Sequence, residues 1–210
     1  MPPKVTPPQG RTYRSPRRAQ QAAETRAAVL AAAGDLFAAR GWTATSMRDV
    51  ASAAGVSVET IYATHGNKAT LLLAAIDAGV VGDLDPVALR ERSEFAALAR
   101  GGFEERAAAL ARLATGIHER TSGLFLALRE GAAGDPALAT RLAELEEARR
   151  TNVAEAFALV AGRVVTERER DGLLAIGSGE VFRLLIQDSG WSIEQYETWL
   201  ADTIVRHLRT

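Results

Sequence analysis

The sequence predicts an all-α fold, and three observations lead to that class. Neither sustained period-two alternation of apolar residues nor an Asn-Gly hairpin signal occurs in the 210 residues, so strands are not expected. Apolar residues instead recur at helical spacing along most of the chain. Five of the seven prolines lie at or before Pro16, and Pro86 and Pro136 each follow an aspartate, a pair that starts helices.

The N-terminal third is expected to hold a short basic arm and four helices. A first helix spans about 17–40 and ends at Gly41, because glycine suits the backbone turn after a helix. Thr45, Ser57 and Asn67 then begin helices at about 46–53, 58–64 and 67–80. The predicted divisions are a flexible arm (1–16), a helix-turn-helix domain (17–66) and a connecting helix (67–80).

The remainder, 81–210, is expected to form a second, larger helical domain. Helices are predicted at about 86–99, 103–119, 122–132 and 136–162. Capping boxes at Thr166–Glu169 and Ser192–Gln195 open later helices, and the Gly177–Gly179 stretch should break the segment between them. The whole chain would contain about nine helices.

Composition excludes several kinds of site. The chain has no cysteine, which rules out disulfides, thiolate metal sites and a cysteine nucleophile. The N-terminus is basic and proline-rich, unlike a signal peptide, and the apolar runs are far shorter than the roughly 20 residues of a membrane span. We therefore expect a cytoplasmic protein that does not enter a membrane and that holds neither a metal nor a cofactor.

Charge is divided unevenly along the chain. The net charge of −1 combines +5 over residues 1–70, from nine Lys/Arg and four Asp/Glu, with −6 over residues 71–210. A basic first third favours an anionic partner for that part of the molecule. The alternative is an uneven distribution without function.

The stretch VASAAGVSVETIYATHGNK, residues 50–68, has the pattern of a helix-turn-helix. Gly55 would supply the left-handed backbone that ends the first helix, and small Ala51 would let the second helix cross closely. The outer side of that second helix would carry Glu59, Thr60, Ala63 and Thr64 and could enter the major groove of DNA. An ordinary helical hairpin has similar spacing and remains the alternative.

Basic and polar residues around this motif suit phosphate oxygens. Arg48, Tyr62 and Lys68 flank the second helix, and the arm adds a run of cations without an acid through residue 20: Lys4, Arg11, Arg14, Arg17 and Arg18. Such an arm could lie along the DNA backbone or enter the minor groove. Its alternative is a solvated tail.

The segment LFAARGWTATSMRDVASAAGVSVETIYATHGNKATLLLAAI resembles the DNA-binding segment of tetracycline-repressor (TetR) family regulators, and the resemblance extends over 26–80. WSIEQYETWLADTIVRHL resembles the C-terminal ends of such proteins. The resemblance implies a homodimer on a palindromic operator and a C-terminal domain, 81–210, that dimerises and binds a small-molecule effector. It places the following residues toward DNA: Ser46, Arg48, Ser57, Val58, Glu59, Thr60, Tyr62, Thr64 and Lys68.

Two residues depart from the family pattern. His65 stands where an aromatic residue, commonly phenylalanine, packs beneath the recognition helix. A packing role is expected for it, with pH-sensitive DNA binding as the alternative. Glu59 stands where a small residue or proline is usual, and could either accept from cytosine N4 or favour the helix N-terminus.

The segment 173–186, LLAIGSGEVFRLLI, is apolar on nearly every face, so it is expected to be buried all round. With the terminal helix it would form a homodimer interface over about 173–208, and an internal core helix is the alternative. Six residues are expected near an effector pocket from their helical positions: Phe103, His118, Phe125, Arg129, Phe157 and Gln187.

No pattern indicates an enzyme. The three histidines are scattered, and HExxH, a Gly-rich phosphate loop and Gly-x-Ser-x-Gly do not occur. The function predicted is a ligand-responsive repressor that binds operator DNA, and the alternative is a helical interaction module without DNA binding.

Overall fold

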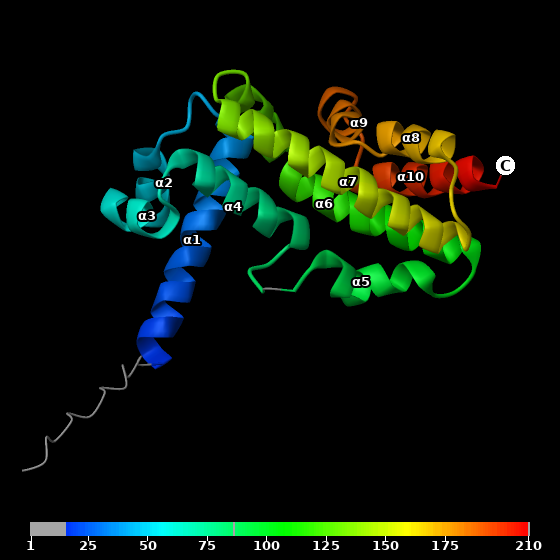
Figure 1. Cartoon of the computed structure of the whole chain (residues 1–210), viewed down its shortest axis with the longest axis horizontal. Helices are drawn as coiled ribbons and strands as arrows, with labels where there is room; N and C mark the ends of the chain where they lie inside the picture. The colour runs from blue at the N-terminus through cyan, green and yellow to red at the C-terminus, as the bar shows by residue number, and fades with distance from the viewer. Residues whose placement is uncertain (1–15, 86, 210) are drawn as a thin grey trace, which may run out of the picture.

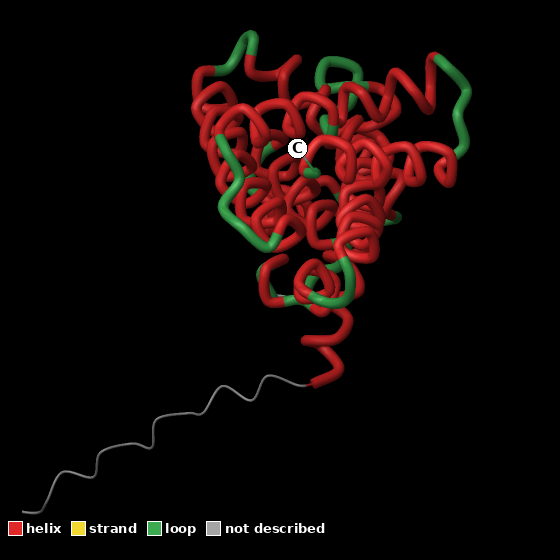
Figure 2. Tube along the Cα trace, turned by 90° about the vertical axis from the view of Figure 1, so that its right-hand side faces the viewer, coloured by secondary structure: helices red, strands yellow, loops and turns green. Residues whose placement is uncertain are grey.

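A computed structural model describes residues 16–85 and 87–209, and within these ranges every regular element is helical (Figure 2). This confirms the all-α class. Of the predicted arm, residues 1–15, which include Lys4, Arg11 and Arg14, lie outside the described residues, whereas Pro16, Arg17 and Arg18 form the start of the first helix. None of the helices in the described ranges is long and apolar enough to cross a membrane.

The first four helices follow the predicted order. They are α1 (Pro16–Arg40), α2 (Met47–Ala54), α3 (Val58–His65) and α4 (Lys68–Val81). Gly41 and Gly55 end α1 and α2 with φ of 77° and 67°, in the left-handed region where glycine is favoured. Ser57 and Asn67 cap α3 and α4, as expected.

The cap of α2 was predicted one residue too early. Ser46, not Thr45, is the N-cap, because its hydroxyl accepts from Asp49 N while Asp49 accepts from Ser46 N. Thr45 is buried, and its hydroxyl donates to the carbonyls of Leu36 and Gly41 at the end of α1. Thr45 therefore fixes the turn between α1 and α2.

The second part of the chain is built around one long helix (Figure 1). Its elements are η1 (Leu89–Glu91), α5 (Ser93–Ala96), η2 (Ala97–Ala99), α6 (Phe103–Ala132), α7 (Pro136–Ala161), α8 (Glu167–Ile176), α9 (Gly179–Arg183), the π-helical η3 (Leu184–Asp188) and α10 (Ile193–Leu208). Asp135, Thr166 and Ser192 cap α7, α8 and α10 as predicted. The break between α8 and α9 also falls where Gly177 and Ser178 indicate it.

Two predicted boundaries are wrong. Helices 103–119 and 122–132 form the single helix α6, because Thr121 and Ser122 are buried within the fold and the Thr121 hydroxyl donates to Ile117 O inside the helix. The predicted helix 86–99 is instead the short elements η1, α5 and η2. There the Arg92 guanidinium binds Asp83 and the carbonyl of Val87, which favours a compact loop over a continuous helix.

Two apolar cores share α6. The first joins α1–α4 to the second half of α6 through Leu124, Ala127 and Leu128. The second surrounds the first half of α6 and contains the inner faces of α7, α8 and α10. The stripe of α10 that includes Tyr196, Leu200, Ile204 and Leu208 is buried in this second core, so it packs within its own chain. A movement of α6 would therefore change the packing of both cores.

Candidate nucleic-acid interface

A buried wedge between α2 and α3 holds the helix-turn-helix together. Met47, Val50, Ala51 and Ile61 are buried in the first core, and Val56 packs against it. Because one side of α3 packs against this wedge, its opposite side faces outward. Ala51, which the sequence analysis predicts to let the two helices cross closely, is among the buried residues.

The outward side of α3 carries the residues predicted to face DNA. Glu59, Tyr62 and Thr64 are exposed, and Tyr62 keeps 51% of its surface accessible. Thr60 is half-buried; its hydroxyl lies 3.0 Å from that of Ser57, and its N–H donates to Ser57 Oγ at 3.2 Å. Exposed Tyr62 on a short, firmly capped helix gives α3 a large side chain for contact with a partner.

Glu59 lies in the first turn of α3. Hydrogen bonds from its own backbone N–H, and then from the Ser57 side chain, lower the pKa of this exposed carboxyl below its usual value. The carboxylate therefore complements the positive end of the α3 dipole. This arrangement favours the helix-terminus role over base recognition.

Other predicted DNA-facing residues surround α3. Ser46 and Arg48 are exposed at the start of α2, and Arg17 and Arg18 are exposed at the start of α1. Val58 is only half-buried and packs against the first core, so it contributes more to packing than to an outer surface.

Lys68 is held by its own protein. Its ammonium lies 4.2 Å from the centre of the Trp42 ring and donates to Trp42 O. Partial burial lowers the pKa of Lys68, and the nearby carboxylate of Glu130 opposes that shift. The structure thus gives Lys68 an intramolecular role that the sequence did not indicate.

His65 occupies the packing position expected for it. The residue is 9% exposed, and its Nε2 has no hydrogen-bond partner among the described residues. Burial, and then the charge of Arg26, lower the pKa of this imidazole, so it is neutral near pH 7. A neutral, buried ring fits packing better than a charge switch.

The six residues expected at an effector pocket do not converge on one cavity. His118 and Phe157 are buried in the second core, whereas Phe125 packs against the first. Phe103 lies beneath the Arg209 guanidinium, and Gln187 is exposed. Arg129 forms ion pairs with Glu146 of α7 and Glu180 of α9.

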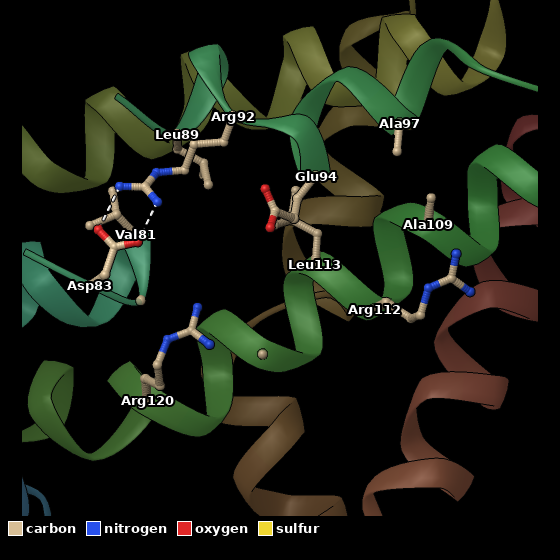
Figure 3. Close-up of a pocket in the computed structure, with 12 residues that line it drawn as sticks. Val81, Asp83, Leu89, Arg92, Glu94, Ala97, Ala109, Arg112, Leu113 and Arg120 are labelled. Carbon is tan, nitrogen blue, oxygen red and sulfur yellow. Dashed lines mark hydrogen bonds and ion pairs between the residues drawn. The ribbon is translucent and has the colours of Figure 1, made fainter. Parts of the chain in front are cut away.

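A different part of the molecule is hollowed. A groove of about 520 Å³ lies between the end of α4, the following loop with η1 and α5, and one face of α6 (Figure 3). Its lining combines apolar Val81, Leu89 and Leu113 with Arg92, Arg112 and Arg120, and includes none of the six predicted residues. Gly116 and Ala109 lie on the α6 face, and small residues at these positions leave the space open.

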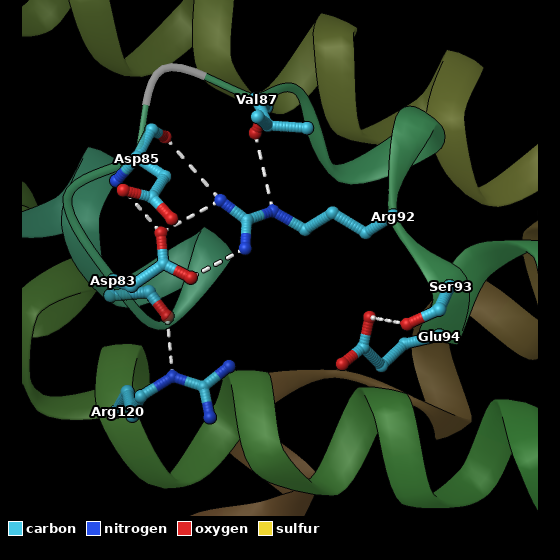
Figure 4. Close-up of polar contacts among 8 residues, drawn as sticks. Asp83, Asp85, Val87, Arg92, Ser93, Glu94 and Arg120 are labelled. Atoms are coloured by element: carbon cyan, nitrogen blue, oxygen red, sulfur yellow. Dashed lines mark hydrogen bonds and ion pairs between the residues drawn. The ribbon is translucent and has the colours of Figure 1, made fainter.

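Two arginines of the groove hold its walls together (Figure 4). Arg92 Nη2 donates to Asp83 Oδ1 at 2.8 Å, and Arg92 Nε donates to Val87 O at 3.2 Å. Arg120 Nε donates to Gly79 O at 2.7 Å and so satisfies a carbonyl in the last turn of α4. Sequence spacing could not reveal these contacts, because each joins segments whose approach depends on the tertiary fold.

Among the described residues, no group of three or more His, Asp or Glu side chains could hold a metal ion. The α3 surface offers hydroxyls and an aromatic side chain, and the groove offers three arginines.

Comparison with known proteins agrees with this geometry. Residues 29–75, from the second half of α1 into α4, match the family model described as bacterial regulatory proteins, tetR family. No curated protein matches the chain.

Solved structures resemble the chain over nearly its whole length. A putative TetR-family transcriptional regulator from Rhodococcus sp. is 23% identical, with a TM-score of 0.63 over 88% of this chain and 98% of that one. A putative TetR-family regulator from Mesorhizobium loti is 18% identical, with a TM-score of 0.60 over 90% and 97%. A TetR-family regulator from Streptomyces coelicolor is 22% identical, with a TM-score of 0.57 over 89% and 95%. Residues 29–75 therefore match the tetR-family model, and the chain as a whole has the fold of TetR-family transcriptional regulators.

Proposed function

We propose that this protein is a DNA-binding transcriptional regulator, and specifically a ligand-responsive repressor that binds a palindromic operator as a homodimer in the cytoplasm. The observation that carries the proposal is the outward face of α3, with exposed Glu59, Tyr62 and Thr64 on a helix supported by a buried wedge. A helix presented in this way fits the major groove, which is about 12 Å wide. Occupation of a promoter by such a protein is enough to block transcription.

The dimer would form through the surface around 173–208. Leu184 is 53% exposed on η3, and a depression of about 480 Å³ on the outer side of α10 is lined partly by Trp191 and Trp199. An exposed leucine and two partly exposed tryptophans in this segment favour a protein partner. A second copy would also supply the second recognition helix, about 34–36 Å from the first or a multiple of that distance.

The effector would bind in the groove beside α4. This groove is connected to α4, because Arg120 lines the groove and also donates a hydrogen bond to the last turn of α4. A ligand there would change how α4 is held against α6 and so alter the spacing of the recognition helices. A coupling of about 1–3 kcal/mol would change operator affinity by about 5–150-fold.

Selection of bound sequences from random duplexes tests the proposed function directly. The expected result is a palindrome with two half-sites, bound with an affinity that falls steeply as salt rises, with a logarithmic slope of roughly one per phosphate neutralised. The alternative, a helical interaction module, predicts no enriched sequence and a shallow salt dependence. Enrichment of a single half-site by a monomeric protein would contradict the dimer.

A further inference from the structure

The turn between α1 and α2 is hydrogen-bonded to a carboxylate from α6. Glu130, near the end of α6, accepts hydrogen bonds from Trp42 N at 2.7 Å and from Thr43 N at 3.0 Å. The two N–H groups reach different oxygens, so the carboxylate is engaged on both sides. Hydrogen bonding by Thr43, first through its side chain, and by the two backbone N–H groups lowers the pKa of Glu130 below its usual value.

Lys68 completes this contact from a third element. It is the first residue of α4, where the positive end of the helix dipole disfavours a cation. Three interactions offset this unfavourable position: the ammonium lies over the Trp42 ring, donates to Trp42 O and is attracted by Glu130. We call Glu130, Lys68 and the backbone of Trp42–Thr43 the clasp.

Small residues bring the backbones close enough for the clasp to form. A Cβ on Gly41 would lie 2.5 Å from Glu130 Oε2, and one on Gly131 would lie 3.0 Å from the Trp42 ring. Farther back on α6, a Cβ on Gly123 would lie 2.8 Å from the Cβ of Ala38 in α1. The first part of the chain thus rests directly on α6, and Figure 1 places the turn after α1 beside the end of α6.

We infer that Glu130 is a positioning residue that sets the orientation of the helix-turn-helix relative to α6. The turn it holds leads, through Thr45 and the N-cap Ser46, straight into α2, which packs against α3. A shift of α6 therefore reaches the recognition helix through this turn, in addition to any movement of α4. The inference rests on the proposed function, because orientation matters only if two recognition helices must meet two half-sites.

If Glu130 acted only through its charge, its removal would change operator affinity in the opposite direction from the loss of a positioning contact. Removing an acidic charge from a DNA-binding protein should raise its affinity for DNA, since phosphates are repelled less. Loss of the clasp should lower operator affinity, because only a fraction of the molecules would then present α3 in the orientation that binds. The two explanations are thus separated by the direction of the change.

The test compares Glu130→Gln and Glu130→Asp with wild type and with Glu119→Gln. Glutamine removes the charge and leaves an amide that can accept from only one of the two N–H groups. Aspartate keeps the charge but is one methylene too short to reach both. Glu119 is exposed on the same helix, so Glu119→Gln removes the same charge without touching the clasp.

Each protein is checked by circular dichroism to be folded at the assay temperature and titrated with the selected operator, with random duplex, and with operators whose half-sites are one base pair closer or farther apart. We expect both Glu130 variants to bind the operator about tenfold more weakly, with unchanged or tighter binding to random duplex and a flatter dependence on spacing. Glu119→Gln should keep the wild-type spacing preference.

Operator affinity and spacing preference equal to wild type in both folded Glu130 variants would overturn the inference. So would wild-type behaviour of Glu130→Asp alone, because charge would then be the only property that matters. If wild type itself selects no sequence, the proposed function fails and the role of the clasp fails with it.

Discussion

Acid should destabilise this protein through His118, a buried histidine of the second core. His118 is 8% exposed, its Nδ1 lies 3.2 Å from the Tyr196 hydroxyl, and its ring lies 5.7 Å from that of Phe182. Burial, and then the positive charge of Arg149, lower the pKa of His118 from 6.5 to about 4. The perturbation we consider is His118→Gln, which keeps a hydrogen-bonding side chain beside Tyr196 but cannot titrate.

The size of the effect follows from linkage. Above about pH 6.5 the imidazole is neutral in both the folded and the unfolded chain, so it makes no pH-dependent contribution. Between pH 6.5 and about 4 the unfolded chain binds a proton that the folded protein does not. The free energy of unfolding therefore decreases as the pH is lowered through this range. One pKa unit corresponds to about 1.36 kcal/mol, so the loss attributable to His118 is about 3 kcal/mol at the lower end.

Urea unfolding at fixed protein concentration, followed by tryptophan fluorescence between about pH 7.5 and about pH 4, measures this contribution. Carboxylates will also titrate in both proteins, so the informative quantity is the free energy of unfolding of wild type minus that of His118→Gln. This difference should be constant above pH 6.5 and fall by about 3 kcal/mol on acidification. Curves that stay parallel to within about 1 kcal/mol would refute the assignment of a buried, neutral His118.

Three further predictions, made with four substitutions, test the packing and the DNA-facing surface. Gly123→Ala should destabilise the protein by about 1–3 kcal/mol in urea unfolding, because its Cβ would lie 2.8 Å from the Cβ of Ala38; the matched Gly34→Ala, with nothing within 4 Å, should stabilise it by about 0.5–1 kcal/mol, and equal effects would contradict this. His65→Phe should raise stability by about 1 kcal/mol or more by removing the buried Nε2 that has no partner among the described residues; it should also leave the pH dependence of operator binding unchanged, and a changed profile would revive the pH switch. Glu59→Gln should select the same operator sequence as wild type and bind random duplex more tightly, whereas a new preferred base at one position would show that Glu59 reads DNA.

Local features of the fold could be predicted from sequence because they depend on neighbouring residues. Ser57, Asn67, Thr166 and Ser192 each cap the helix that follows them through a side chain that reaches a backbone N–H three residues away. The apolar wedge of α2 and α3 was likewise recognisable, since its members recur at helical spacing. The exposed side of α3 follows from the same periodicity.

Failures of prediction occurred where distant segments decide the outcome. Thr121 and Ser122 resemble a helix start, yet they lie inside α6 because neighbouring helices bury them. Arg129 was predicted near the effector pocket but forms an ion pair with Glu180 from α9. The six predicted pocket residues do not line the groove beside Arg120 for the same reason. A cavity forms where several elements meet, and the sequence does not show which elements those are.

The sequence by itself determined the helical class, most of the caps and the side of α3 that faces outward, because these depend on contacts within a few residues. Only the tertiary structure decided that α6 joins both cores, that Arg120 holds the end of α4 and that Glu130 holds the turn before α2. Those contacts link residues up to 88 positions apart. No local pattern marks them, because an exposed glutamate or arginine looks the same in sequence whether it faces water or a distant backbone.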